Sequence, residues 1–192
     1  MRLFIAINFS DEVKRSLGSF MSELRILPSD AKWVEVENLH LTLLFLGNVP
    51  GDQVSSITRA LNRSVKGASN FCLDLGGVGV FPGPARPRVF WVGISGDTAA
   101  LLRLYRQVQK EMGRLGFESG KSRFSPHLTL ARFRSPTGFS AVMERAEKVA
   151  GEHKIFSSVE VNSVELMLSE LGPKGPKYSV LAGVPLDGPS QV

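Results

Sequence analysis

Cysteine is nearly absent from this sequence, in which Cys72 is the single example among 192 residues. One chain therefore cannot form an internal disulfide, a cysteine-based zinc site or an iron–sulfur cluster, and we expect Cys72 to be structural or incidental. No run of about 18 apolar residues occurs, and the opening segment MRLFIAIN is too short for a secretory signal. These absences favour a soluble protein of the reducing cytoplasm that does not engage a membrane.

Acidic residues are fewer than basic ones, with 18 Asp and Glu against 23 Lys and Arg, which gives a net charge of +5. A field of this sign favours anionic ligands such as phosphate esters or nucleic acid. Ordinary solvated surface charge would give the same balance, so composition alone does not choose between the two. Because 43% of the residues are hydrophobic, the chain can form one large domain or two closely packed lobes.

Hydrophobic periodicity predicts a chain in which strands outnumber helices. Apolar stripes at helical spacing predict one helix that begins after the cap residue Ser10. They predict three further helices at about 52–65, 97–115 and 140–150. The Gly- and Pro-rich segment 76–88 is predicted to be a turn or exposed loop, and the tail from Pro185 to be loose. This order favours the α+β class with mainly antiparallel sheets. Strands are predicted at residues 2–8, 32–37, 39–46, 71–80, 89–94, 127–133, 155–161, 164–169 and 178–184.

The tetrapeptide HLTL occurs twice, at residues 40–43 and 127–130, and the two copies begin 87 residues apart. Each copy follows an apolar strand and an amphipathic helix and precedes another helix and further strands, which indicates an internal duplication. The repeat is too long for a solenoid. We therefore expect residues 1–192 to form a single two-lobed domain, with pseudo-symmetric sheets facing a central cleft and helices on the outside.

Alternate side chains of a strand share a face, so His40 and Thr42 should point one way and the intervening leucines the other. The same rule pairs His127 with Thr129. If the lobes face each other through these strands, two imidazoles and two hydroxyls converge on one cleft. Histidine has an ordinary pKa near 6.5, so one ring can act as an acid while its partner acts as a base. This arrangement suits a phosphate that must be attacked and released on opposite sides, with the threonine hydroxyls donating to its oxygens.

Other uses of these residues remain open from the sequence. A lone histidine at a strand edge is more often structural, but two that begin identical strings in a repeat are hard to explain structurally. A zinc site is the rival use, yet there is no HExxH string and no acidic residue beside either HLTL, so we expect neither a metal nor a cofactor. The run Gly76–Gly79 lacks the ending of a phosphate-binding loop and is predicted to be a turn. His153, in a polar segment, is expected to be exposed and inert.

At these residues the chain resembles the two-histidine phosphoesterase superfamily and, within it, the RNA 2',3'-cyclic phosphodiesterases that are also called 2'-5' RNA ligases. The matching blocks run in the expected order along nearly the whole chain. They are RLFIAIN, KWVEVENLHLTLLFLG, FPGPARPRVFWVGI, FSPHLTLARF and GPKGPKYSVL.

The resemblance implies a bilobal α+β fold and hydrolysis of the 2',3'-cyclic phosphate end of an RNA to a 2'-phosphate without metal. Some relatives also join RNA ends through a 2'-5' linkage. His40 would be the general acid and His127 the general base, with Thr42 and Thr129 holding the phosphate, although the residues alone do not separate the two imidazole roles. The substrates would be RNA ends, such as those of tRNA fragments, or small cyclic nucleotides, and we expect a monomer. A non-catalytic binder of RNA is the alternative.

The resemblance also implies that Arg132 contacts phosphate or RNA. Strict alternation from His127 places Arg132 on the face away from the cleft, so its participation requires a twist or a bulge near the end of the strand. A wider basic group could follow the RNA backbone or could be an ordinary solvated rim. Tyr178 or Phe9 could stack on a base, although core packing is the commoner use of such rings. The basic group comprises Lys121, Arg123, Arg132 and Arg134.

Overall fold

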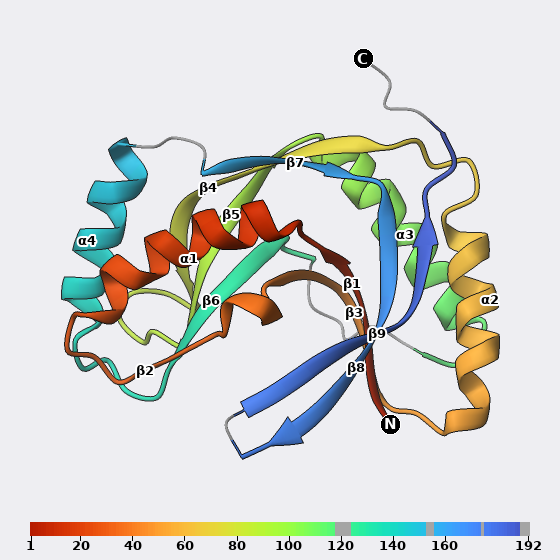
Figure 1. Ribbon diagram of the computed structural model, residues 1–192, viewed down its shortest axis with the longest axis horizontal. Helices are drawn as coiled ribbons and strands as arrows, with labels where there is room; N and C mark the ends of the chain where they lie inside the picture. Colours follow the sequence, from red (N-terminus) through yellow and green to blue (C-terminus); the bar gives the residue numbers. More distant parts are fainter. Residues whose placement is uncertain (118–123, 153–155, 174, 189–192) are drawn as a thin grey trace.

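The computed structural model describes residues 1–117, 124–152, 156–173 and 175–188, and it is an α+β fold with helices outside two antiparallel sheets, as predicted (Figure 1). No helix within these ranges is long and apolar enough to cross a membrane. The elements are β1 (Arg2–Asn8), α1 (Asp11–Arg25), β2 (Ala31–Trp33), the 3-10 turn η1 (Val36–Asn38), β3 (His40–Asn48), the 3-10 turn η2 (Gly51–Gln53), α2 (Val54–Ser64), β4 (Phe71–Phe81), β5 (Val89–Gly96), α3 (Thr98–Gly113), β6 (His127–Phe133), α4 (Phe139–Glu152), β7 (Ser157–Val161), β8 (Ser163–Gly172) and β9 (Gly175–Pro185).

The two sheets confirm the predicted pseudo-symmetry. Sheet A has the strand order β3-β1-β8-β9, and sheet B has the order β2-β6-β5-β4-β7. Beginning from each HLTL strand, β3-β1-β8-β9 therefore corresponds to β6-β5-β4-β7. The lobes are not two consecutive halves of the chain, however. Sheet A takes β8 and β9 from the C-terminal part, because β8 pairs with β1 as well as with β9. Sheet B takes β2 and β4 from the N-terminal part, because β2 pairs with β6 and β4 pairs with β5.

The helices bury the apolar faces that their spacing predicts. Ser10 caps α1 by accepting a hydrogen bond from the Val13 amide, and Asp97 caps α3 by accepting one from the Ala100 amide. Helices α1 and α4 pack against sheet B, whereas α2 and α3 lie together over sheet A (Figure 1). One large cluster of buried side chains runs through both lobes, and a small second cluster comprises Phe4, Ala6 and Met167. The helices therefore cover the outer faces of the sheets and leave the inner faces to form the cleft.

The predicted turn at residues 76–88 is wrong for its first half, because β4 continues through Gly76–Phe81. The glycines make room for a side chain instead of reversing the chain. A Cβ atom at Gly79 would lie 2.2 Å from the indole of Trp91 on β5. Gly77 has φ +64° where the β4–β5 register shifts, a conformation that favours glycine. Only the segment after Phe81 forms the loop to β5.

Several other boundaries differ from the predictions, and the β8–β9 hairpin extends up to three residues further than predicted on each strand, to Gly172 and from Gly175. The strand predicted at 32–37 ends at Trp33, and η1 follows, because β2 is an edge strand that pairs with β6 over three residues only. The strand predicted at 155–161 begins at Ser157, and residue 155 lies outside the described residues. The tail is not loose directly after Pro185, since Leu186 is buried and its amide donates to the Asn162 carbonyl at 2.8 Å.

Replacement of Gly79 by alanine tests the packing between β4 and Trp91. The added methyl group would overlap the indole, so we expect Gly79→Ala to lower the free energy of unfolding by about 1–3 kcal/mol, as overpacking of a filled site does. Gly183→Ala in β9 is the matched control, because a Cβ atom there would meet nothing within 4 Å. Urea unfolding of both variants measures the effect, and equal stabilities of the two variants would contradict it.

Candidate active site

A cleft of about 610 Å³ lies where strands β3 and β6 face each other at the junction of the two sheets. All five predicted site residues line it, and they come from these two strands: His40, Thr42, His127, Thr129 and Arg132. The structure therefore brings together residues that are far apart in the sequence.

The alternation of each HLTL strand places its histidine and threonine toward the cleft. His40 and Thr42 are half-buried, whereas Leu41 and Leu43 are buried in the core on the opposite face. His127 and Thr129 alternate in the same way with Leu128 and Leu130 on β6. Each lobe thus anchors its strand with leucines on one face and presents one imidazole and one hydroxyl on the other.

Arg132 reaches the cleft because β6 contains the bulge that its participation requires. Trp91 of β5 pairs with Thr129, and the preceding residue Phe90 pairs with Ala131, so that Leu130 has no partner on β5. The extra residue reverses the alternation. Ala131 is therefore buried, and the exposed Arg132 side chain lines the same cleft as His127 and Thr129.

Strand β3 has a bulge at the corresponding place. Ile5 and Ala6 of β1 pair with Leu44 and Thr42, which leaves Leu43 unpaired. Phe45 consequently occupies the position that Arg132 occupies in the other lobe, five residues after the histidine. Its side chain lines the cleft and is 65% exposed. Phe45 is not among the predicted site residues, although an alignment of HLTLLF with HLTLAR would have shown the equivalence.

Each imidazole is held by a hydrogen bond from its Nδ1 atom to a backbone carbonyl two residues earlier. His40 Nδ1 lies 2.7 Å from the Asn38 carbonyl oxygen, and His127 Nδ1 lies 2.7 Å from the Ser125 carbonyl oxygen. A carbonyl can only accept, so each Nδ1 carries the proton and donates it. In a neutral ring the Nε2 atom is then the basic one. His40 Nε2 lies 2.9 Å from Thr42 Oγ1, which donates to it.

Aromatic rings fix the plane of each imidazole, but they differ between the lobes. His40 contacts Phe4 and Tyr178, with ring centroids 4.9 and 5.2 Å away. His127 contacts Phe81 at 5.0 Å and Trp91 at 6.4 Å. Each histidine is therefore restrained both by packing and by its Nδ1 hydrogen bond.

The hairpin of β8 and β9 forms one wall of the cleft. Ser169, Leu171, Pro176 and Tyr178 of this hairpin line it. The Asn38 side chain at the end of η1 donates to the Pro176 carbonyl at 2.8 Å, which ties the hairpin to the segment directly before His40. The sequence leaves stacking on a base or packing in the core open for both Tyr178 and Phe9. Tyr178 reaches the cleft, whereas Phe9 is buried in the core.

The cleft has basic but no acidic side chains among the described residues that line it; Arg2 joins Arg132 there. Burial raises the pKa of the Tyr178 hydroxyl, and the charges of Arg132 and Arg2 oppose that rise. Within the described ranges, no three His, Cys, Asp or Glu side chains gather as a metal site would need. The lining offers hydrogen-bond donors and positive charge, which is the chemistry that recognises a phosphate.

Other members of the predicted basic group do not join this site in the described structure. Arg134 borders a different hollow, beside β2. Lys121 and Arg123 lie outside the described residues, as does His153.

The family model and the similar proteins of known name agree on one family. The family model of the 2'-5' RNA ligase superfamily matches residues 13–173. A protein of Thermotoga maritima named RNA 2',3'-cyclic phosphodiesterase is 35% identical over 189 residues, which cover 98% of this chain and 97% of that protein. A protein of the same name from Archaeoglobus fulgidus is 36% identical over 181 residues, covering 94% and 98% of the two chains.

Solved structures show the same architecture. A crystal structure from Thermus thermophilus superposes with a TM-score of 0.80 at 29% identity and covers 98% of this chain and 99% of that one. Escherichia coli LigT in complex with 3'-AMP gives a TM-score of 0.76 at 25% identity, with 97% and 98% of the chains covered.

Titration of His40 tests its burial. Burial lowers the pKa of the imidazole below its ordinary value of 6.5; the Asn38 carbonyl opposes this shift, and the charge of Lys14 adds to it. In the unfolded chain the ring regains its ordinary pKa, so the unfolded state binds more protons as the pH falls below 6.5. The stability that neutral His40 contributes is therefore complete above that pH and is lost as the pH falls toward the folded pKa.

We accordingly expect an NMR titration to give His40 a midpoint below 6.5. The His40→Gln variant assigns the resonance, and its free energy of unfolding should fall less steeply between neutral and acidic pH than that of the wild type. A midpoint at or above 6.5 would contradict the expectation.

Proposed function

The chain belongs to the 2'-5' RNA ligase superfamily, and from this premise we propose that it hydrolyses 2',3'-cyclic phosphate ends of RNA to 2'-phosphomonoesters by metal-independent two-histidine catalysis. The observation that carries the proposal is the convergence of two His-Thr pairs, from bulged strands of two different sheets, on one cleft without carboxylates in its described lining. The names of the relatives support the reaction class. The family and the reaction together make the protein a hydrolase.

In the proposed reaction, a water oxygen attacks phosphorus and the bond from phosphorus to O3' breaks. The Nε2 atom of one imidazole takes a proton from the water, and the Nε2 atom of the other gives a proton to O3'. The products are a 2'-phosphomonoester and a 3'-hydroxyl. Attack and departure lie in line on opposite sides of phosphorus, which explains why one histidine from each lobe suits the chemistry.

Thr42, Thr129 and Arg132 hold the phosphate in this scheme. The two hydroxyls donate to the non-bridging oxygens, and the Arg132 guanidinium offsets their charge through the transition state. The bond from Thr42 Oγ1 to His40 Nε2 in the free protein must then open, so that the hydroxyl turns to the phosphate and Nε2 becomes available.

The acid and base roles follow the family resemblance, with His40 as acid and His127 as base. The lowered pKa of free His40 makes it neutral before substrate binds. A phosphate anion bound beside its ring favours the charged imidazolium and opposes the effect of burial, so His40 gains its proton together with the substrate.

The proposed partners are RNA ends, including those of tRNA fragments, and small cyclic nucleotides that present the same cyclic phosphate to a monomer in the cytoplasm. The complex of LigT with 3'-AMP supports a nucleotide as a ligand of this fold. Ligation through a 2'-5' linkage uses the same displacement with an RNA 5'-hydroxyl in place of water: its oxygen attacks phosphorus and loses its proton, the bond from phosphorus to O3' breaks, and O3' takes a proton.

Removal of either imidazole should nearly abolish the activity. We expect His40→Ala and His127→Ala each to lower kcat/KM for adenosine 2',3'-cyclic phosphate by at least about 100-fold, because each loses one of the two proton transfers. His153→Ala replaces the third histidine and is the control. Near-wild-type turnover in either of the first two variants would refute the proposal. Salt-sensitive binding of RNA ends by wild-type protein that releases no 2'-phosphate would identify a non-catalytic binder instead.

Chelation provides an independent test of the metal-independent mechanism. Excess EDTA should leave turnover unchanged, since the proposed acid and base are both side chains. Loss of activity that returns on addition of a divalent cation would establish a metal-dependent reaction and overturn this part of the proposal.

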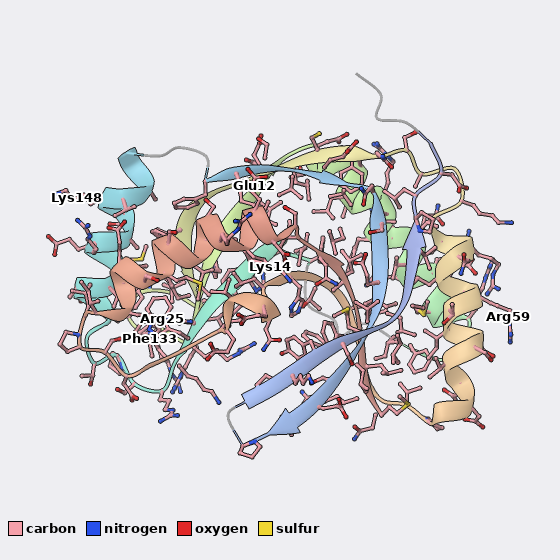
Figure 2. The ribbon with its side chains drawn as sticks, in the orientation of Figure 1. Glu12, Lys14, Arg25, Arg59, Phe133 and Lys148 are labelled. Atoms are coloured by element: carbon pink, nitrogen blue, oxygen red, sulfur yellow. The ribbon has the colours of Figure 1, made fainter. Side chains whose placement is uncertain are left out.

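Arg132 should contribute through its charge. We expect Arg132→Gln to lower kcat/KM by about 10- to 100-fold and to reduce the slope of log kcat/KM against log salt concentration by roughly 1. Arg59→Gln, on the outer side of α2 (Figure 2), removes the same net charge far from the cleft and is the matched control. Equal effects of the two substitutions would show that only net charge matters.

A further inference from the structure

Two cations lie directly opposite each other at the rim of the cleft. Lys32 of β2 pairs with Arg132 of β6 in the antiparallel register, and residues paired in this way place their side chains on the same face of the sheet. Arg132 lines the cleft, so the Lys32 side chain lies on the cleft side of sheet B. The residues on either side of Arg132 agree with this orientation, since Ala131 and Phe133 are buried in the core.

The ammonium group of Lys32 reaches the wall that the β8–β9 hairpin forms. A Cβ atom at Gly175 would lie 3.9 Å from Lys32 Nζ, and the next residue, Pro176, lines the cleft. Lys32 therefore has a cleft-lining residue on each side, Arg132 on its own sheet and Pro176 on the hairpin. Beyond it lies the hollow beside β2, which Lys32 and Arg134 border. Positive charge thus continues outward from the cleft along sheet B.

Neither member of this pair of cations forms an ion pair within the described part of the chain. Asp30 and Glu35 border the same hollow, but neither of them approaches a cation closely enough to form one. Like charges directly opposite each other on paired strands destabilise a sheet, and an anion that contacts both would remove this cost. The ion pairs of the described residues are Arg63–Glu111, Arg114–Glu111 and Arg145–Glu23.

We propose that Lys32 binds the phosphate that precedes the terminal nucleotide, so that the protein prefers the cyclic end of an RNA chain to a single cyclic nucleotide. This inference rests on the proposed function and adds a residue that selects the length of the substrate. In that function Arg132 contacts the cyclic phosphate, and the preceding phosphate is attached through O5' of the same ribose. The two phosphates are separated by one ribose, and the two cations are separated by one strand spacing.

Arg2 is the competing site for this phosphate, because it also lines the cleft. Its partners in the register of sheet A are Asn48 and Ser169, which are uncharged. Positive charge is therefore concentrated on the side of Lys32 and Arg132, where two adjacent cations attract a doubly anionic RNA end more strongly than one. A compact ammonium group on a flexible stem also suits a phosphate whose position varies with the conformation of the RNA.

Three substrates isolate the contribution of the preceding phosphate. They are adenosine 2',3'-cyclic phosphate, the dinucleotide ApA ending in a 2',3'-cyclic phosphate, and the same dinucleotide with an uncharged methylphosphonate linkage. Wild-type protein should hydrolyse the charged dinucleotide with a kcat/KM about 5-fold above that of the other two, as expected for one partly exposed charge pair. Its plot of log kcat/KM against log salt concentration should be steeper by roughly 0.7, the value for one phosphate of a single strand.

Lys32→Gln should abolish both advantages of the charged dinucleotide, and Lys32→Arg should keep them. Lys148→Gln on α4 removes the same charge far from the cleft and should also keep them (Figure 2). The ratio between substrates is measured on one variant at a time, so a general loss of folded protein cancels. Thermal unfolding of Lys32→Gln should show no loss of stability, because the substitution relieves the pair of like charges.

Equal kcat/KM values for the mononucleotide and the charged dinucleotide in wild-type protein would overturn the inference while leaving the proposed hydrolase intact. An unaltered ratio in Lys32→Gln would also overturn it, as would loss of the ratio in Arg2→Gln alone, which would assign the phosphate to sheet A. Preference for the methylphosphonate dinucleotide equal to that for the charged one would assign the effect to the second base. No hydrolysis of any of the three substrates by wild-type protein would instead refute the proposed function itself.

Discussion

The contact between β3 and β6 at the junction of the two sheets is the constraint on which the site depends. Each strand is fixed from behind by its buried leucines and from the side by its antiparallel neighbour, so its histidine and threonine can face only the cleft. Because the strands belong to different sheets, the two imidazoles approach from different sides. In the proposed reaction, a phosphate between them is attacked and released in line, which one sheet with two adjacent histidines would not permit.

The bulges in these strands are the second determinant of the site. The unpaired Leu43 in β3 and the unpaired Leu130 in β6 change the face on which the next side chains lie, and they bring Phe45 and Arg132 into the cleft. The bulges preserve the symmetry of the duplication, whereas the two side chains break it. The cleft thereby combines two similar His-Thr pairs with two dissimilar side chains, one apolar and one cationic.

Much of this arrangement follows from the sequence because its signals are local. Periodicity gives the helices and most strands, and the repeated HLTL gives the two lobes and the four residues His40, Thr42, His127 and Thr129. The exchange of strands between the sheets has no local signal, since it depends on long-range pairing. The bulges are equally hidden, and without them alternation places Arg132 on the wrong face. The turn prediction for Gly76–Gly79 is wrong because glycine in a strand can serve a neighbouring ring, here Trp91, as well as a turn.

The most direct test of the account is whether one phosphate meets both rings. Protein labelled with ¹⁵N-histidine can be titrated with 2'-AMP, the proposed product from a cyclic adenosine end, while the Nε2 and Nδ1 resonances are followed by NMR. We predict that the resonances of His40 and His127 shift together with a single midpoint, at one nucleotide per chain. A response from only one of these imidazoles, or two separate midpoints, would contradict the shared site.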